Sequence, residues 1–194
     1  MLAEAGHEVV GVDPATASVG VARAKPGAEH VRWVVGDTAA ALPVQVDVAT
    51  LTGNVAQAVV DLADWEALLR AAHDALRPGG HLVLETRDPG YRGWEEWTRS
   101  ATYRSVDLDG VVEGAGAVET WTELLDVDLP LVTFRHTWVF GADGAVLTSD
   151  STLRFRLRDE VTADLAAQGF AVLDVRDAPD RPGRELVFLA QRVG

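Results

Sequence analysis

Two aspartates stand where short apolar segments end, a position from which a carboxylate can bind a ligand. Asp13 follows Val9–Val12, a run rich in β-branched residues, and Pro14 comes next. Asp37 closes a second such run, residues 31–35. Such runs are typical of strands buried on both faces of a parallel sheet. Ligands bind at the carboxyl ends of these strands, where an ionised aspartate can accept hydrogen bonds from the vicinal hydroxyls of a ribose.

Helix capping is the alternative role for both aspartates. Aspartate is favoured at helix N-caps and proline in the first helical turn, so Asp13 could simply cap the helix that follows it. Asp37 could accept a hydrogen bond from an exocyclic amine, such as that of adenine, or it could be a second cap. Two acidic strand ends separated by one helix are more specific than either alone.

Further polar residues are expected at the same edge of the sheet. Residues 46–51 form a third predicted strand, which runs into a polar, glycine-containing loop at 52–57 that includes Asn54. Arg87 follows a fourth predicted strand, residues 81–86, and could bind a polar substrate. A solvated turn is the alternative interpretation of Arg87. If the strands are parallel, these side chains lie at the same edge as the two aspartates.

The residues from 89 onward offer one candidate general base and a possible apolar wall. His136 is the base candidate, because its predicted strand would face the site; a half-buried histidine in an aromatic sheet face is the alternative. Trp94 and Trp97 could line an acceptor site, although core packing would also explain them. The other histidines are scattered, at positions 7, 30, 73 and 81. Their spacing suits no metal site, so no metal is predicted.

The predicted elements that position these residues form an α/β fold with a mostly parallel, Rossmann-like sheet and helices on both faces. Helices at 15–24 and from 64 to 76 alternate with the four strands, which implies right-handed crossovers. A helix at 159–168 follows later in the chain. The final strands, 170–175 and 185–191, are joined by a tight turn, so the last strand is reversed.

Residues 89–157 interrupt this pattern with a short helix and an antiparallel β insertion. Strands are predicted at 118–127, 131–140 and 145–157, with a hairpin turn at 141–144. Apolar residues alternate with Arg154, Arg156 and Arg158 along the last strand, which predicts one covered face and one wet face. We interpret residues 89–157 as a lid over the ligand edge of a single domain, whose core is 1–88 and 158–194.

Composition narrows the class of protein. The 194 residues carry a net charge of -13 with a pI of about 4.7, which argues against nucleic acid as a partner. The absence of cysteine excludes disulfides and thiol chemistry and suits a cytoplasmic protein. No apolar run approaches the ~20 residues of a membrane span, and the first residues do not form a signal peptide. The oligomeric state is not predicted.

Four segments together resemble the class I S-adenosylmethionine-dependent methyltransferases. They are Glu8–Asp13, Val34–Asp37, Leu51–Asn54 and Leu76–Leu82, in that order. The last, which reads LRPGGHL, is the most specific, because this phrase before a strand is habitual in that family. The resemblance covers nearly the whole chain apart from the insertion, and it includes the reversed last strand.

The resemblance implies a role for each matching residue toward S-adenosylmethionine as cofactor. Asp13 would hold the ribose hydroxyls, with Pro14 near the adenine. Asp37 would accept a hydrogen bond from the adenine amine, with Thr38 beside it. The remaining implied contacts are made by Leu51 and Thr52, through their backbone to the methionine part, and by Asn54 toward the substrate. The acidic surface and the aromatic insertion favour a small-molecule methyl acceptor.

The family's first strand and its Gly-x-Gly-x-Gly loop are expected before residue 1 and are absent from this sequence. That strand would lie between those at 9–12 and 46–51. Losing about four buried aliphatic side chains removes on the order of 6–12 kcal/mol, against a typical domain stability of about 5–15 kcal/mol. We therefore expect these 194 residues alone to fold poorly and to bind the cofactor weakly.

Two other functions fit part of the pattern. A nicotinamide-dependent oxidoreductase, binding NAD(P), also places an acidic residue after its second strand, and its diagnostic loop would fall in the same missing segment. Asp37 and the Arg77–Gly80 phrase have no assigned role in that case. A non-catalytic domain with a vestigial Rossmann-like fold is the second alternative.

Overall fold

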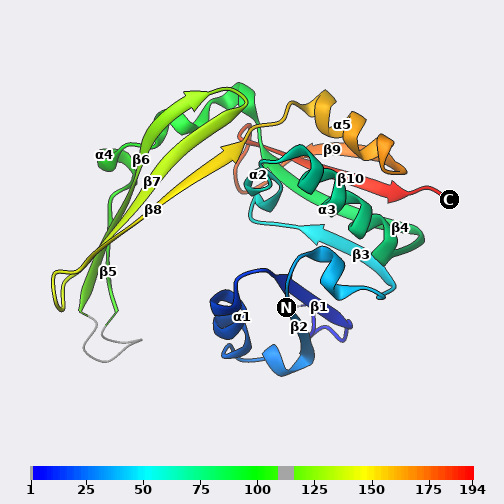
Figure 1. Ribbon diagram of the computed structural model, residues 1–194, viewed down its shortest axis with the longest axis horizontal. Coiled ribbons are helices and arrows are strands. Elements are labelled where there is room, and N and C mark those ends of the chain that lie inside the picture. Colours follow the sequence, from blue (N-terminus) through cyan, green and yellow to red (C-terminus); the bar gives the residue numbers. More distant parts are fainter. Residues whose placement is uncertain (1, 109–115) are drawn as a thin grey trace.

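The computed structural model describes residues 2–108 and 116–194 as a mixed α/β fold (Figure 1). The described residues form three sheets, with strand orders β1-β2, β3-β4-β10-β9 and β5-β6-β7-β8. The α/β core contains β1 (Val9–Asp13), β2 (Val31–Val35), β3 (Val46–Leu51), β4 (Leu76–Arg87), β9 (Phe170–Asp177) and β10 (Glu185–Arg192). Its helices are α1 (Thr16–Arg23), α2 (Val55–Ala58), α3 (Leu62–Ala75) and α5 (Arg158–Ala167).

The parallel and reversed strands are those that the sequence predicted. β1 pairs with β2 in parallel, from Val9 opposite Val31 to Asp13 opposite Val35. β3 pairs with β4 in parallel, whereas β10 runs antiparallel to both β4 and β9. The carboxyl ends of β3 and β4 therefore lie beside the first residue of β10.

The expected single sheet is only partly confirmed, because the described residues contain two separate core sheets. β1 is paired with β2 alone, and β3 is paired with β4 on one side only. Figure 1 shows β1 and β2 below β3, with no strand between β1 and β3. This is the place where the resemblance puts the family's first strand. The structure shows no pairing there within the described range.

The main core fills one face of the four-stranded sheet. Helices α3 and α5 both pack there, and the buried cluster includes Trp65, Leu69, Leu82, Leu84, Val161, Leu165 and Phe188. Leu84 lies opposite Phe188 across β4 and β10, so the two side chains share that face. At the start of β4, a Cβ on Gly80 would lie 3.1 Å from the backbone oxygen of Asp47, which explains a glycine at this close approach. Residues 77–80, which the sequence predicted to lie between the helix from 64 to 76 and the strand at 81–86, are instead part of β4, as is Leu76.

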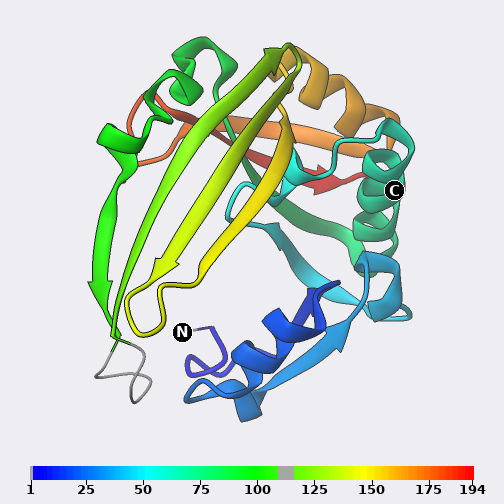
Figure 2. The same cartoon turned by 60° about the vertical axis from the view of Figure 1, so that its left-hand side comes forward.

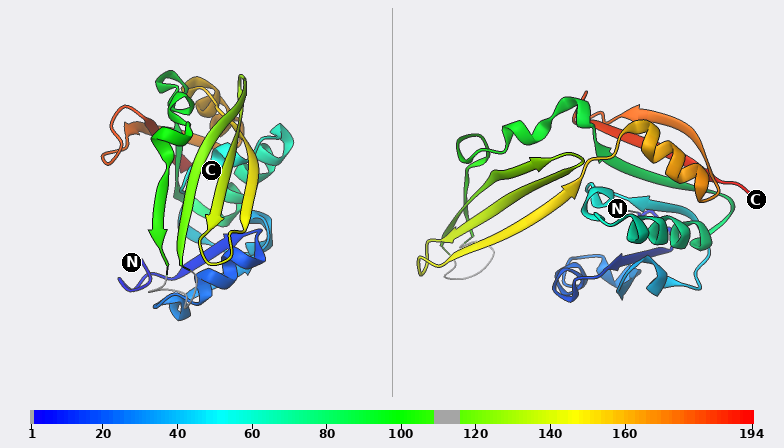
Figure 3. Two further views of the ribbon diagram at one scale, coloured as in Figure 1. Left: turned by 90° about the vertical axis from the view of Figure 1, so that its left-hand side faces the viewer. Right: turned by 45° about the horizontal axis from the view of Figure 1, so that its top comes forward.

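The insertion is a curved antiparallel sheet that projects from the core (Figures 2 and 3). Its strands are β5 (Arg104–Asp107), β6 (Ala117–Asp128), β7 (Leu131–Phe140) and β8 (Val146–Arg154). The sequence missed β5, because four residues are too few to show an alternation. The predicted helix at 91–102 is a series of short turns: 3₁₀ helices at Pro89–Tyr91 and Gly93–Glu96, then α4 (Arg99–Thr102). Two further 3₁₀ helices are Ala28–His30 and Thr38–Ala41.

The prediction for the end of β8 was wrong. β8 ends at Arg154, and the alternation that predicted a wet arginine face does not continue. Arg156 is only 2% exposed, whereas Leu157 is 63% exposed. The backbone N–H of Phe155 donates to the oxygen of Pro130, and the chain then leaves the sheet and turns into the core. Arg156 is buried because it finds partners there, as described below.

No helix of the described ranges is both long and apolar enough to cross a membrane.

Helix α3 begins two residues earlier than predicted, and its cap supplies a test of the fold. The carboxylate of Asp61 accepts hydrogen bonds from the backbone N–H groups of Ala63 at 2.7 Å and Asp64 at 3.2 Å. We expect Asp61→Ala to lower the free energy of unfolding by about 1 kcal/mol, measured by urea melts. Asp64→Ala, a neighbouring substitution that leaves the cap intact, should cost less. Equal losses for the two variants would contradict this assignment.

Candidate functional site

Asp13 and Asp37 lie at one edge of the β1–β2 pair; Asp37 caps the 3₁₀ helix that follows it, whereas Asp13 closes a turn before α1, whose N-cap is Ala15. Asp13 Oδ1 accepts a hydrogen bond from the Ala15 N–H at 2.8 Å, and Asp37 Oδ1 accepts one from the Ala40 N–H at 3.0 Å. Thr38 opens the 3₁₀ helix that Asp37 caps. An ionised carboxylate has about four lone-pair sites, so a cap does not prevent further hydrogen bonds to a ligand.

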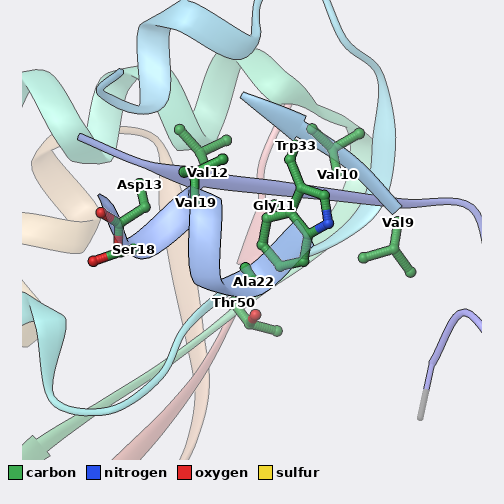
Figure 4. Close-up of a pocket in the computed structure, with 10 residues that line it drawn as sticks. All are labelled: Val9, Val10, Gly11, Val12, Asp13, Ser18, Val19, Ala22, Trp33 and Thr50. Carbon is green, nitrogen blue, oxygen red and sulfur yellow. The ribbon is translucent and has the colours of Figure 1, made fainter. Parts of the chain in front are cut away.

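A cavity of about 320 Å³ lies beside Asp13 (Figure 4). It is lined by residues of β1 and α1, by Trp33, and by Thr50 of β3. A second depression, of about 460 Å³, shares Gly11 and Trp33 and reaches Thr52. A Cβ on Gly11 would lie 2.4 Å from the Trp33 ring, so glycine is what allows this ring to cross β1. The cavity thus joins the acidic end of β1 to the carboxyl-terminal part of β3.

The turn after β3 has an unusual backbone that a missed residue, Glu85, holds in place. Gly53 and Asn54 have φ values of 67° and 58°, both in the left-handed region. Glu85 Oε1, on β4, accepts from the Gly53 N–H at 2.5 Å and from the Asn54 N–H at 3.3 Å. Consecutive N–H groups in such a turn form a concavity that favours an anion, here the carboxylate of Glu85. Leu51, just before the turn, packs against the main core.

A second carboxylate, Glu185, binds the side chain of Asn54. Asn54 Nδ2 donates to Glu185 Oε1 at 3.1 Å, and the two side chains are buried, at 5% and 3% exposure. Arg181 Nη1 donates to the same oxygen at 2.6 Å. Asn54 Oδ1 and Glu185 Oε2 are buried and have no hydrogen-bond partner among residues 2–108 and 116–194. Glu185 was not singled out from the sequence, although the predicted reversal of the last strand places its first residue at this edge.

Arg87 is held by polar and aromatic contacts rather than lying in a solvated turn. Its Nη1 donates to Gln57 Oε1 at 2.9 Å, and its guanidinium lies 5.9 Å from the centre of the Trp97 ring. Burial lowers the pKa of Arg87, and the nearby Glu185 carboxylate partly offsets this effect. Gln57, which is fully buried, was not singled out from the sequence. Only its position in the polar loop could have indicated it.

His136 lies in an aromatic face of the insertion sheet, and Trp94 is packed in a small core. Both ring nitrogens of His136 contact threonine hydroxyls, Nε2 with Thr120 at 2.5 Å and Nδ1 with Thr122 at 3.3 Å. The ring also stacks on Trp138, with centroids 4.2 Å apart. Trp94 is buried edge-on against Phe155. A general-base role for His136 would require one threonine contact to give way.

Within the described ranges, no group of three or more histidine or acidic side chains is placed to hold a metal ion.

Comparison with known families identifies the N-terminal part of the site. Residues 1–80, which include Asp13, Asp37 and the turn at 52–54, match the family model of the methyltransferase domain. Over these residues the chain is similar to a methyltransferase domain. S-adenosylmethionine is the cofactor of this class. No curated protein sequence matches the chain.

Solved structures of methyltransferases share the fold over nearly the whole chain. An S-adenosylmethionine-dependent methyltransferase from Clostridium acetobutylicum has a TM-score of 0.74 at 14% identity and covers 97% of this chain and 76% of its own. CcbJ from Streptomyces caelestis has a TM-score of 0.72 at 18% identity, with 100% and 78% covered. CalS10 from Micromonospora echinaspora, an amino pentose methyltransferase solved with its cofactor, has a TM-score of 0.68 at 23% identity, with 96% and 74% covered. The insertion is therefore part of a fold found in this class.

The left-handed backbone at Asn54 can be tested directly. We expect Asn54→Ala to destabilise the protein more than Asn54→Gly, by about 0.5–1 kcal/mol, because only glycine adopts this φ without steric cost. Both variants lose the contact with Glu185, so the difference isolates the backbone. Urea melts of the two variants measure it, and a glycine variant no more stable than the alanine variant would refute the assignment.

Proposed function

We propose that this protein transfers a methyl group from S-adenosylmethionine to a small-molecule acceptor. The observation that carries the proposal is the position of Asp13, which ends β1 at the same edge as Asp37, within the residues that match the methyltransferase domain. In this proposal the core, residues 1–88 and 158–194, binds the cofactor. The insertion, residues 89–157, covers the acceptor.

The cofactor contacts follow from the strand ends. Asp13 would accept hydrogen bonds from the ribose hydroxyls, with Pro14 near the adenine. Asp37 would accept a hydrogen bond from the adenine amine, with Thr38 beside it. The backbone of Leu51 and Thr52 would line the methionine part, next to the left-handed turn. In the implied Rossmann-like sheet, mostly parallel and with helices on both faces, β1 and β3 would stand on either side of one further strand.

The chemistry places modest demands on the protein. The cofactor supplies the methyl group from its sulfonium, and the displacement is in line, so much of the barrier can be lowered by positioning alone. A general base is needed only where the acceptor must lose a proton. His136 is then the candidate base. Asn54 and Arg87 would orient the acceptor, while the buried Trp94 would shape the wall behind it.

An aminated sugar is the first class of acceptor to test. CalS10 is an amino pentose methyltransferase, and MtfA, with a TM-score of 0.59 at 18% identity, is a glycopeptide N-methyltransferase. In this protein, the unpartnered oxygens of Asn54 and Glu185 suit N–H donors.

Asp13→Asn tests the cofactor site. The substitution keeps an oxygen that can cap Ala15 but removes the charge, and a charged hydrogen bond contributes roughly 1.5–3 kcal/mol. We expect affinity for S-adenosylhomocysteine to fall about 10- to 100-fold, measured by calorimetry or equilibrium dialysis. The same titration of the unchanged protein measures the weak affinity expected from the sequence.

Asp143→Asn is the matched control for this experiment. Asp143 Oδ1 accepts from the Ala145 N–H at 2.9 Å, the same kind of turn contact, but it lies in the distant hairpin of the insertion. Asp143→Asn should leave the affinity for S-adenosylhomocysteine unchanged. A protein that binds NADH and not S-adenosylhomocysteine would overturn the proposal in favour of an oxidoreductase.

Methyl transfer itself can be measured with radiolabelled cofactor. We expect label to reach small aminated sugars and not RNA or DNA, because the net charge of -13 repels phosphate. Label that appears only in nucleic acid would contradict the small-molecule assignment.

A further inference from the structure

The short helix α2 lies between the turn that would bind the cofactor and the insertion. It starts at Val55, directly after the left-handed turn at 52–54, and it has four residues. Figure 1 shows it beside the end of β8, where the insertion returns to the core. A helix of this length has almost no stability of its own, so its position depends on the residues that contact it.

Arg156 holds the carboxyl-terminal half of α2. Its Nη1 donates to the Ala56 oxygen and its Nη2 to the Val59 oxygen, both at 2.8 Å. The last carbonyls of a helix lack partners within the helix, so a guanidinium can satisfy two of them at once. The same guanidinium lies over the ring of Trp65, 4.3 Å from its centre. Burial and, to a lesser extent, Arg154 lower the pKa of Arg156 to about 10, which leaves it charged at neutral pH.

Arg87 holds α2 through the buried side chain of Gln57. Gln57 Oε1 accepts hydrogen bonds from Arg87 Nη1 at 2.9 Å and from the Arg87 N–H at 3.4 Å. Arg87 also contacts the insertion, because its guanidinium faces the ring of Trp97. Trp97 in turn packs against Phe134 of β7, with ring centroids 4.9 Å apart.

The two arginines stand at the two points where the chain crosses between core and insertion. Arg87 is the last residue of β4, just before the insertion begins, and Arg156 follows β8, just before α5. Both connections between core and insertion therefore contact the same four-residue helix, α2.

We propose that Arg87 and Arg156 are positioning residues that couple the insertion to the turn at 52–54 through α2. The insertion would thus help to set the geometry of the cofactor site as well as covering the acceptor. The role of the turn in cofactor binding rests on the proposed function, whereas the coupling itself is a property of the free protein.

Hydrogen–deuterium exchange on the full chain tests the coupling without any ligand. In Arg156→Met, which keeps much of the side-chain volume, we expect amides of residues 52–59 to exchange about tenfold faster or more. Amides of β4 at 81–86 should keep their protection. Arg135→Met is the matched control, since Arg135 pairs with Asp150 at 2.7 Å within the insertion sheet and is partly exposed. It should leave residues 52–59 unchanged.

Gln57→Met repeats the test from the helix side and remains informative if Arg156→Met fails to fold. Gln57→Met should speed amide exchange at residues 52–59. The double variant Gln57→Met/Arg87→Met should exchange little faster than Gln57→Met, because both substitutions remove the hydrogen bond between Arg87 and Gln57. We also expect Arg156→Met and Gln57→Met each to weaken S-adenosylhomocysteine binding about fivefold or more, with Arg135→Met unaffected.

Unchanged exchange at 52–59 in folded Arg156→Met and Gln57→Met would overturn the coupling. Faster exchange with unchanged S-adenosylhomocysteine affinity would overturn the positioning role. An unchanged protein that shows no affinity for S-adenosylhomocysteine would count against the proposed function instead, while the exchange experiment would still decide the coupling.

Discussion

The left-handed turn at Gly53 and Asn54 is the constraint on which the rest of the site depends. Glycine adopts a positive φ freely, but at Asn54 this conformation has a steric cost, which is offset here by contacts from two neighbouring core strands. Glu85 on β4 binds the turn's N–H groups, and Glu185 on β10 binds the Asn54 side chain. The reversed direction of β10 is what brings the second carboxylate to this edge.

At the end of β1, Asp13 combines a structural contact with its proposed role in cofactor binding. The interpretation of Asp13 as a cap and its interpretation as a ligand residue were set against each other in the sequence, yet a carboxylate can do both. Its contact with the Ala15 N–H fixes the side chain at the end of β1 before any ligand arrives. A carboxylate held in this way loses less conformational entropy when it binds. The turn contact, which is not a cap of α1, is therefore compatible with the proposed binding role.

The sequence predicted those features that depend on local periodicity. The parallel pairs, the reversed last strand and the β6–β8 sheet all follow from apolar patterning, turns and strand order. The sequence-based prediction failed where a residue's environment is set by partners that are far away in the sequence. Arg156 looked like a solvent-facing position of β8, because alternation cannot show where a strand stops pairing. Glu185 and Gln57 gave no local signal, since their partners lie on other elements.

Arg87 and Arg156 also define the two ends of the insertion. Under the proposed function, variation in the sheet between them would change what covers the acceptor, while the contacts of Arg87 and Arg156 with α2 would stay the same. Exchange of insertions between relatives that share this fold would therefore keep the cofactor side intact only with junctions outside both arginine positions. With junctions between the two arginines, the exchanged sheet would not bring its own arginine contacts to α2. Under the proposed function, the positions just outside Arg87 and Arg156 are therefore the junctions at which the insertion could be exchanged to alter the range of acceptors.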